Sequence, residues 1–117
     1  MTSATARDLV LSLEGVTEHD HFGKEAYRGR TAKGKPSKIF MTLWIEEQRA
    51  VLMLTVEQQA HLHGRHPKVF FPVPNKWGEH GATFVELSAV TEKMLREAMA
   101  IAMENAGAVA SKPLTGT

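Results

Sequence analysis

The segment from residue 38 to residue 54 constrains the fold most, because two runs of alternating side chains flank a short polar turn. In residues 38–45, apolar side chains occupy both sets of alternate positions. Residues 46–48 are Glu, Glu and Gln, and an apolar run follows at 49–54. Side chains of a strand alternate between its two faces. We therefore expect an antiparallel hairpin whose first strand is largely covered on both faces.

Two further runs extend this hairpin into a sheet. Residues 26–30 form a short predicted strand, and the Gly and Pro of residues 31–37 indicate the loop that follows it. Residues 83–87 alternate again, and 69–71 are predicted to be briefly extended. Residues 16–23 are polar and are expected to be a connector with Phe22 as its one large anchor.

Three helices are predicted, at residues 4–13, 55–64 and 91–106, and the first and last of them carry the apolar stripe of an amphipathic helix. Thr55 and Gln58 have the spacing of a capping box, in which each side chain satisfies a backbone N–H at the helix start. Thr91 is expected to cap the last helix and Gly107 to end it.

The predicted order is α-β-β-β-α-β-β-α, which favours an α+β two-layer sandwich with helices packed on an antiparallel sheet. A chain of 117 residues forms one domain with one core. We expect that domain to span residues 1–110 and residues 111–117 to form a disordered tail.

Several classes of protein are disfavoured by what the sequence lacks. There is no Cys, so thiolate zinc sites and Cys nucleophiles are absent. No apolar run resembles a signal peptide or a membrane span, so we expect a cytoplasmic protein without a membrane partner. No catalytic motif or phosphate-binding glycine loop occurs, so we expect no enzyme, no catalytic residues and no cofactor.

Basic residues concentrate between residues 24 and 38, although the formal net charge of the chain is only +1. Such a segment can contact the phosphates of a duplex without sequence preference. Alternatively, it is a solvated hairpin end whose lysines keep a sheet edge from aggregating. The candidate nucleic-acid-binding residues are Lys24, Arg28, Arg30, Lys33, Lys35 and Lys38.

The segment FFPVPNKWGEHG, residues 70–81, is too broken for a regular helix and too apolar for an ordinary loop. Two prolines stiffen it, and glycines allow tight turning around Trp77. Trp77 either forms the lip of a ligand groove or stacks on a base, or it plugs the sheet together with Phe70 and Phe71. Large aromatic residues are usually buried, so we expect the plug. The groove candidates are His21, Phe22, Trp44, Trp77 and His80.

The six histidines include two His-x-His pairs, at residues 19–21 and 61–63. Side chains at i and i+2 diverge on a helix, and no recognised metal-ligand pattern is present. We therefore expect surface histidines and no metal site, with His21 in a structural role.

Three blocks of the chain resemble the MmcQ/YjbR family of small bacterial proteins. They are HFGKEAYR (21–28), KIFMTLW (38–44) and FFPVPNKWGEHGATFVEL (70–87), with a departure at Ala82, where an aromatic residue is expected. The resemblance implies a fold similar to that of type III secretion chaperones, and the family is usually labelled DNA-binding. It offers no agreed set of catalytic or base-contacting residues.

Two functional hypotheses follow. The first is weak, sequence-independent DNA binding through the basic hairpin, which the resemblance favours. The second is a module that binds a protein or a small ligand with the sheet face and the Trp77 loop. In both, we expect a monomer or a weak dimer.

Overall fold

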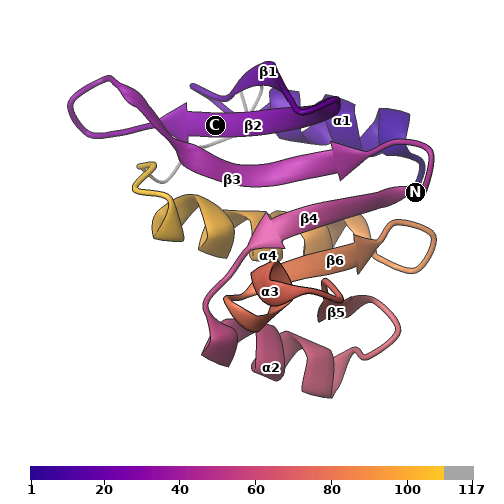
Figure 1. The fold of residues 1–117 in the computed structure, drawn as a ribbon. Helices are drawn as coiled ribbons and strands as arrows, with labels where there is room; N and C mark the ends of the chain where they lie inside the picture. Colours follow the sequence, from indigo (N-terminus) through magenta and orange to yellow (C-terminus); the bar gives the residue numbers. More distant parts are fainter. Residues whose placement is uncertain (110–117) are drawn as a thin grey trace.

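The computed structural model describes residues 1–109, in which antiparallel strands form a sheet of order β1-β2-β3-β4-β6-β5. The predicted hairpin is its centre: β3 (Pro36–Trp44) pairs with β4 (Arg49–Met53). β2 (Lys24–Arg30) and β6 (Ala82–Glu86) flank this pair, as Figure 1 shows. These four strands were all expected from the alternation of side chains.

The two edge strands are β1 (Thr17–His21) and β5 (Phe70–Pro72). The expectation that residues 16–23 form a connector is wrong, because most of them form β1, which pairs with β2. An edge strand bonds a neighbour on one side only and carries many polar side chains. Its sequence, TEHDH, therefore lacks the apolar alternation by which the inner strands are identified.

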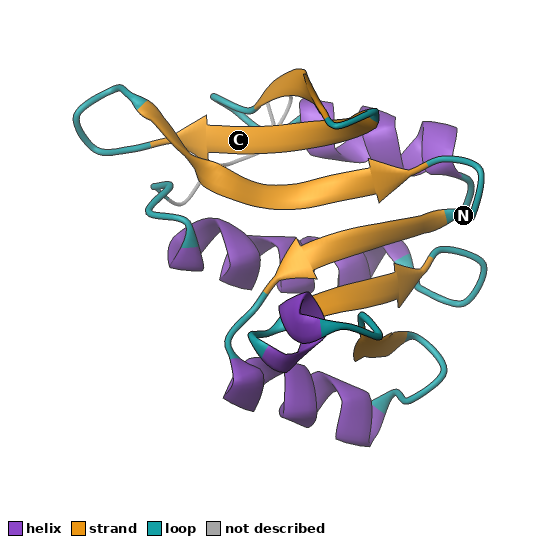
Figure 2. Ribbon diagram, in the orientation of Figure 1, coloured by secondary structure: helices purple, strands orange, loops and turns teal. Residues whose placement is uncertain are grey.

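Within the described part of the chain, four helices accompany the sheet: α1 (Ser3–Leu11), α2 (Val56–Arg65), α3 (Lys76–Glu79) and α4 (Glu92–Asn105). The capping box of Thr55 and Gln58 is present, and the Thr91 side chain accepts a hydrogen bond from the first turn of α4. The short α3 was not expected, since its glycine and the nearby prolines disfavour a helix. Figure 2 shows the helices and strands in separate colours.

The helices α1 and α4 bury one face of the sheet, which confirms the α+β architecture. Val10 of α1 and Met99 of α4 join Met41, Leu52 and other strand residues in one apolar core. In Figure 1, both helices lie behind the sheet, whereas only the short α3 lies in front of it. The expectation that β3 is largely covered on both faces is confirmed for its central part, because Thr42 is buried on the face opposite these helices, where Ile39 and Trp44 are half-buried.

An irregularity in the pairing of β2 with β3 changes which side chains of β3 face the helices. The register shifts between Tyr27 and Arg28. As a result, Phe40 and Met41, which are neighbours in sequence, both pack into the helix-covered core. A bulge breaks the strict alternation of faces, so a pattern count over β3 overestimates the apolar content of the second face.

Some predictions concern features outside the sheet and core. The predicted tail, residues 111–117, lies outside the described residues. Within residues 1–109, no helix is long and apolar enough to cross a bilayer.

An ion pair fastens α1 to the first two strands. The Arg7 guanidinium donates to both carboxylate oxygens of Glu18 on β1, at 2.7 and 2.8 Å. The hydroxyl of Tyr27 on β2 donates to the same carboxylate at 2.7 Å. These bonds, first that from Arg7, hold the pKa of Glu18 below its ordinary value although partial burial acts in the opposite direction.

Replacing Glu18 by Gln should lower the melting temperature at pH 7, since the charged form of Glu18 is the form that the fold stabilises. Because its pKa is depressed in the folded state, this stabilisation is complete above about pH 4.5, the ordinary carboxyl value, and is lost as the pH falls further. Thermal unfolding of the wild type and Glu18→Gln between pH 7 and pH 2.5 or so checks this.

Glu97→Gln is the matched control, because Glu97 is exposed on α4. Its melting temperature should follow that of the wild type at every pH. A Glu18→Gln deficit that persists unchanged in acid would contradict the assigned role of the carboxylate.

Candidate functional site

The face of the sheet opposite α1 and α4 is the candidate site. The pairing of the strands places Thr42, Val51, Phe84 and Phe71 in one row across this face. The Trp44 ring meets Phe84 edge-on at 5.1 Å, and the Phe71 ring lies 5.8 Å from Phe84. The uncovered face therefore has its own small aromatic cluster, separate from the main core.

A groove crosses this face between the β1–β2 turn and the α3 segment. It consists of two adjoining pockets of about 310 and 260 Å³. Both are lined by His21 and Trp77, with Thr42 and Met53 from the central strands. The remaining lining residues are Phe22, Lys24, Ile39, Trp44, Val51, Leu54, Val73, Asn75, His80 and Ala82.

All five groove candidates from the sequence lie in this lining: His21, Phe22, Trp44, Trp77 and His80. That they bind a ligand stays a prediction. Trp77 does not plug the sheet, because 60% of it is exposed. Of the three aromatics assigned to the plug, only Phe70 is fully buried in the main core. The indole therefore lines the groove and is not buried inside the protein.

Trp77 is held in place by a tightly packed turn. The Asn75 side chain caps α3 by accepting a hydrogen bond from the backbone N–H of Trp77 at 2.9 Å. From α2, the amide of Gln59, itself only 6% exposed, donates to the carbonyls of Gly78 and Ala82, both at 3.0 Å. A Cβ at Gly78 would lie 1.7 Å from the Val73 carbonyl oxygen. The turn therefore accepts only glycine at that position.

The groove contains one permanent charge, on Lys24. The Lys24 Nζ lies 4.4 Å from the centroid of the Trp44 ring, within the range of a cation–π interaction. It is also 3.5 Å from the Glu47 carboxylate, and both side chains are partly exposed. The Trp44 indole N–H donates to the Thr42 hydroxyl at 3.2 Å. The hydroxyl hydrogen of Thr42 stays free to rotate toward a ligand.

A second cation lies on the aromatic cluster, away from the groove. The Arg49 guanidinium lies 5.1 Å from the Phe71 centroid and 5.2 Å from that of Phe84, and it bonds Glu86 at 3.1 Å. Burial acts to raise the pKa of Glu86, but hydrogen bonds from Arg49 and Ser88 outweigh it, so the pKa lies below its ordinary value. The charges of Arg49 and Glu86 therefore pair with each other.

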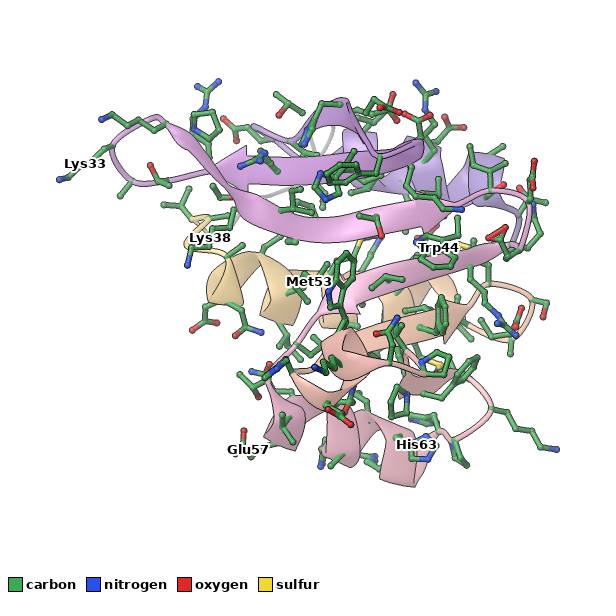
Figure 3. All side chains as sticks on the ribbon, in the orientation of Figure 1. Lys33, Lys38, Trp44, Met53, Glu57 and His63 are labelled. Carbon is green, nitrogen blue, oxygen red and sulfur yellow. The ribbon has the colours of Figure 1, made fainter. Side chains whose placement is uncertain are left out.

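The six predicted nucleic-acid contacts do not form one ridge. Lys24 lies at the groove end of β2, and Arg28 is half-buried, donating to the Ser37 carbonyl at 3.0 Å. Figure 3 shows Lys33 at the far tip of the β2–β3 hairpin, with Trp44 at the opposite end of β3. The four exposed cations that remain around this hairpin are Arg30, Lys33, Lys35 and Lys38.

The histidines serve separate contacts. The His63 Nδ1 lies 2.8 Å from the Phe70 carbonyl oxygen, and His19 lies beside Arg28. His21 packs against Phe22, with ring centroids 4.7 Å apart. Among residues 1–109, no three His, Asp or Glu side chains gather closely enough to hold a metal ion.

Sequence analysis missed several residues of the groove. Thr42, Val51 and Met53 form its floor, and Gln59 positions its wall. A Thr within the otherwise apolar run of β3 was a usable indication of a polar contact on that face. Gln59 gave no such indication, because its partners lie 19 and 23 residues away in sequence.

No family model, curated protein or solved structure matches this chain. The resemblance to the MmcQ/YjbR family therefore stays a prediction, and the functional argument depends on the geometry of the site.

Replacing Gly78 by Ala should lower the free energy of unfolding by about 3 kcal/mol or more, because the new methyl group collides with backbone that cannot move away. Gly64→Ala in α2 is the matched control, since a Cβ there meets no atom within 4 Å. It should stabilise the protein by about 0.5–1 kcal/mol through helix propensity. Urea unfolding measures both, and equal stability of the two variants would contradict the packing described for the α3 turn.

Proposed function

We propose that this protein is a small-molecule-binding module whose site is the groove on the uncovered sheet face. The observation that carries the proposal is the convergence of aromatic and histidine side chains from the β1–β2 turn, β3 and the α3 segment on one groove, with Trp77 held exposed at its wall.

The composition of the groove supports this proposal. Ligand sites are concave, lined mainly by apolar and aromatic side chains, and contain a few polar groups that fix orientation. Here the apolar floor includes Val51 and Met53, and the polar groups are those of Lys24, Thr42 and Asn75. The pocket of about 310 Å³ is at the lower end of the size range for small-molecule sites, roughly 300–1,000 Å³, and the adjoining pocket of about 260 Å³ extends it.

The construction of the Trp77 wall also supports the proposal. An exposed indole adds little to stability, yet buried hydrogen bonds from Gln59 and a close backbone approach at Gly78 fix the backbone that carries it. A side chain that is rigidly placed and left uncovered is pre-organised for binding, because less entropy is lost when a ligand arrives.

Trp77→Ala should abolish most binding while leaving the fold intact. N-phenyl-1-naphthylamine, a neutral probe that fluoresces in apolar sites, should bind the wild type and bind Trp77→Ala at least about tenfold more weakly. Because the indole is 60% exposed, the free energy of unfolding should fall by about 1 kcal/mol or less.

Val56→Ala is the control for this experiment, because Val56 is an exposed apolar residue outside the groove lining. It should leave probe affinity unchanged. Absence of probe binding to the wild type, or equal binding by Trp77→Ala, would refute the groove as a ligand site.

A second candidate function, weak DNA binding, keeps support from the β2–β3 hairpin. Arg30, Lys33, Lys35 and Lys38 are exposed there, and within residues 1–109 none forms an ion pair with a carboxylate. The hairpin extends beyond the rest of the sheet in Figure 1. Free cations on a projecting hairpin suit contact with phosphates, in keeping with the label of the family that the sequence resembles.

If this second function exists, duplex binding should weaken steeply with salt, since about one counterion is released for each phosphate contact. The double variant Lys33→Glu and Lys35→Glu should abolish binding at low salt. Lys68→Glu, which changes an exposed lysine outside the hairpin, is the control. Fluorescence anisotropy with a labelled duplex measures binding by the wild type and by both variants. Binding that changes neither with salt nor in the double variant would exclude the hairpin as the contact.

A further inference from the structure

The β1–β2 turn is the least expected local structure in the molecule. β1 ends at His21 and β2 begins at Lys24, so only Phe22 and Gly23 connect the two strands. Both residues have positive φ, 53° at Phe22 and 84° at Gly23. Two-residue hairpin turns with positive φ at both positions favour Asn-Gly, because Asn tolerates the left-handed region and bulky residues do not.

A phenylalanine at position 22 therefore raises the conformational energy of the turn. Burial of its side chain does not compensate for this cost. Its side chain is 91% exposed, and its ring contact is the edge-on packing with His21. Residues held in sparsely populated backbone regions concentrate at functional sites. Neither turn formation nor core packing explains a phenylalanine here, so contact with something outside the chain is the remaining use of its ring.

The turn lies at the groove. His21, Phe22 and Lys24 line the same pocket as Trp44 and Trp77, so the hairpin end forms the wall opposite the α3 segment. One wall thus presents the Phe22 ring and the other presents the Trp77 indole. Aromatic side chains prefer stacked or edge-on contacts with other rings, which favours a ligand that contains an aromatic ring.

The charges of the groove define the rest of the ligand. No residue that lines either pocket is Asp or Glu, whereas Lys24, which lines one of them, supplies a permanent positive charge. The carboxylate that pairs with Lys24 is that of Glu47, which lies 3.5 Å from the Nζ and remains partly exposed, and Glu25 and Glu46 line a separate pocket beside Lys24. A single cation suits a singly charged anion. A phosphate dianion normally meets several cations or a cradle of backbone N–H groups.

We infer that the groove binds an aromatic monocarboxylate, with the Phe22 ring against the ligand's ring and the Lys24 ammonium on its carboxylate. This inference depends on the proposed function, because it names the ligand class of the same groove. Lys24 exchanges its long contact with Glu47 for the ligand carboxylate, and Phe22 closes on the aromatic ring from the side opposite Trp77.

The test compares 1-naphthoate with 1-naphthalenemethanol, which has the same rings and no charge. Titrations followed by the indole N–H resonances of Trp44 and Trp77, the two tryptophans of the chain, give both affinities at the site itself. On the wild type, the acid should bind about tenfold more tightly than the alcohol. Lys24→Met should remove that ratio and leave the affinity for the alcohol unchanged, whereas Lys68→Met should alter neither.

Two further variants test the turn and its ion pair. Glu47→Gln should strengthen binding of the acid by about threefold, because Lys24 loses its competing partner. Phe22→Asn should weaken both ligands by about tenfold and yet raise the melting temperature by about 2–6 °C, because Asn relieves the turn. Phe22→Tyr keeps the ring and should behave like the wild type in both measurements.

The results that would overturn this inference differ from those that would overturn the proposed function. If N-phenyl-1-naphthylamine binds in a Trp77-dependent manner but the acid and the alcohol bind equally, the groove is supported as a ligand site. The assignment of a carboxylate ligand is then overturned. Adenosine monophosphate binding more tightly than 1-naphthoate would also overturn it, in favour of a phosphate. Phe22→Asn with unchanged affinity, or with a lowered melting temperature, would overturn the role of the turn.

Discussion

The coverage of only one face of the sheet by the long helices α1 and α4 is the constraint on which the rest of this structure depends. α1 and α4 supply enough apolar surface to cover β2, β3, β4 and β6 from one side, and the main core is complete there. The opposite face holds the aromatic and apolar residues of the central strands without a helical layer. What covers this face is a short turn, α3, which reaches only part of it. The groove is the space between that turn and the β1–β2 hairpin.

The inner part of the fold could be predicted from the sequence because its signals are local. Alternation along residues 38–54 identified β3 and β4, and capping by Thr55 and Thr91 identified the starts of α2 and α4. The polar edge strand β1 could not be identified in this way, since its stability comes from pairing with β2 and from the Arg7 contact with Glu18. Those partners are fixed by the tertiary fold.

The candidate site could likewise be predicted only in part from the sequence. The aromatic residues of the groove were recognisable as residue types, but residue type does not determine exposure: Phe70 is buried in the core, and Trp77 is not. The basic segment was recognisable as a charge cluster, but β2 carries Lys24 toward Trp44, at the end of the strand away from the hairpin tip, and directs Arg28 into a bond with Ser37. A cluster in sequence was therefore two groups in space, one belonging to the groove and one to the hairpin.

The two walls of the groove differ in their tolerance of change. The α3 wall is locked, because its backbone passes so close to Val73 and Leu54 that no side chain fits at Gly78 or Gly81. The hairpin wall has open space around it, since a Cβ at Gly23 would meet nothing within 4 Å, although the positive φ of Gly23 disfavours any other residue at that position. New residues can be inserted into the β1–β2 turn without touching the core. Redesign of this scaffold for another guest molecule should accordingly graft loops onto that hairpin and keep the opposite side as a fixed template.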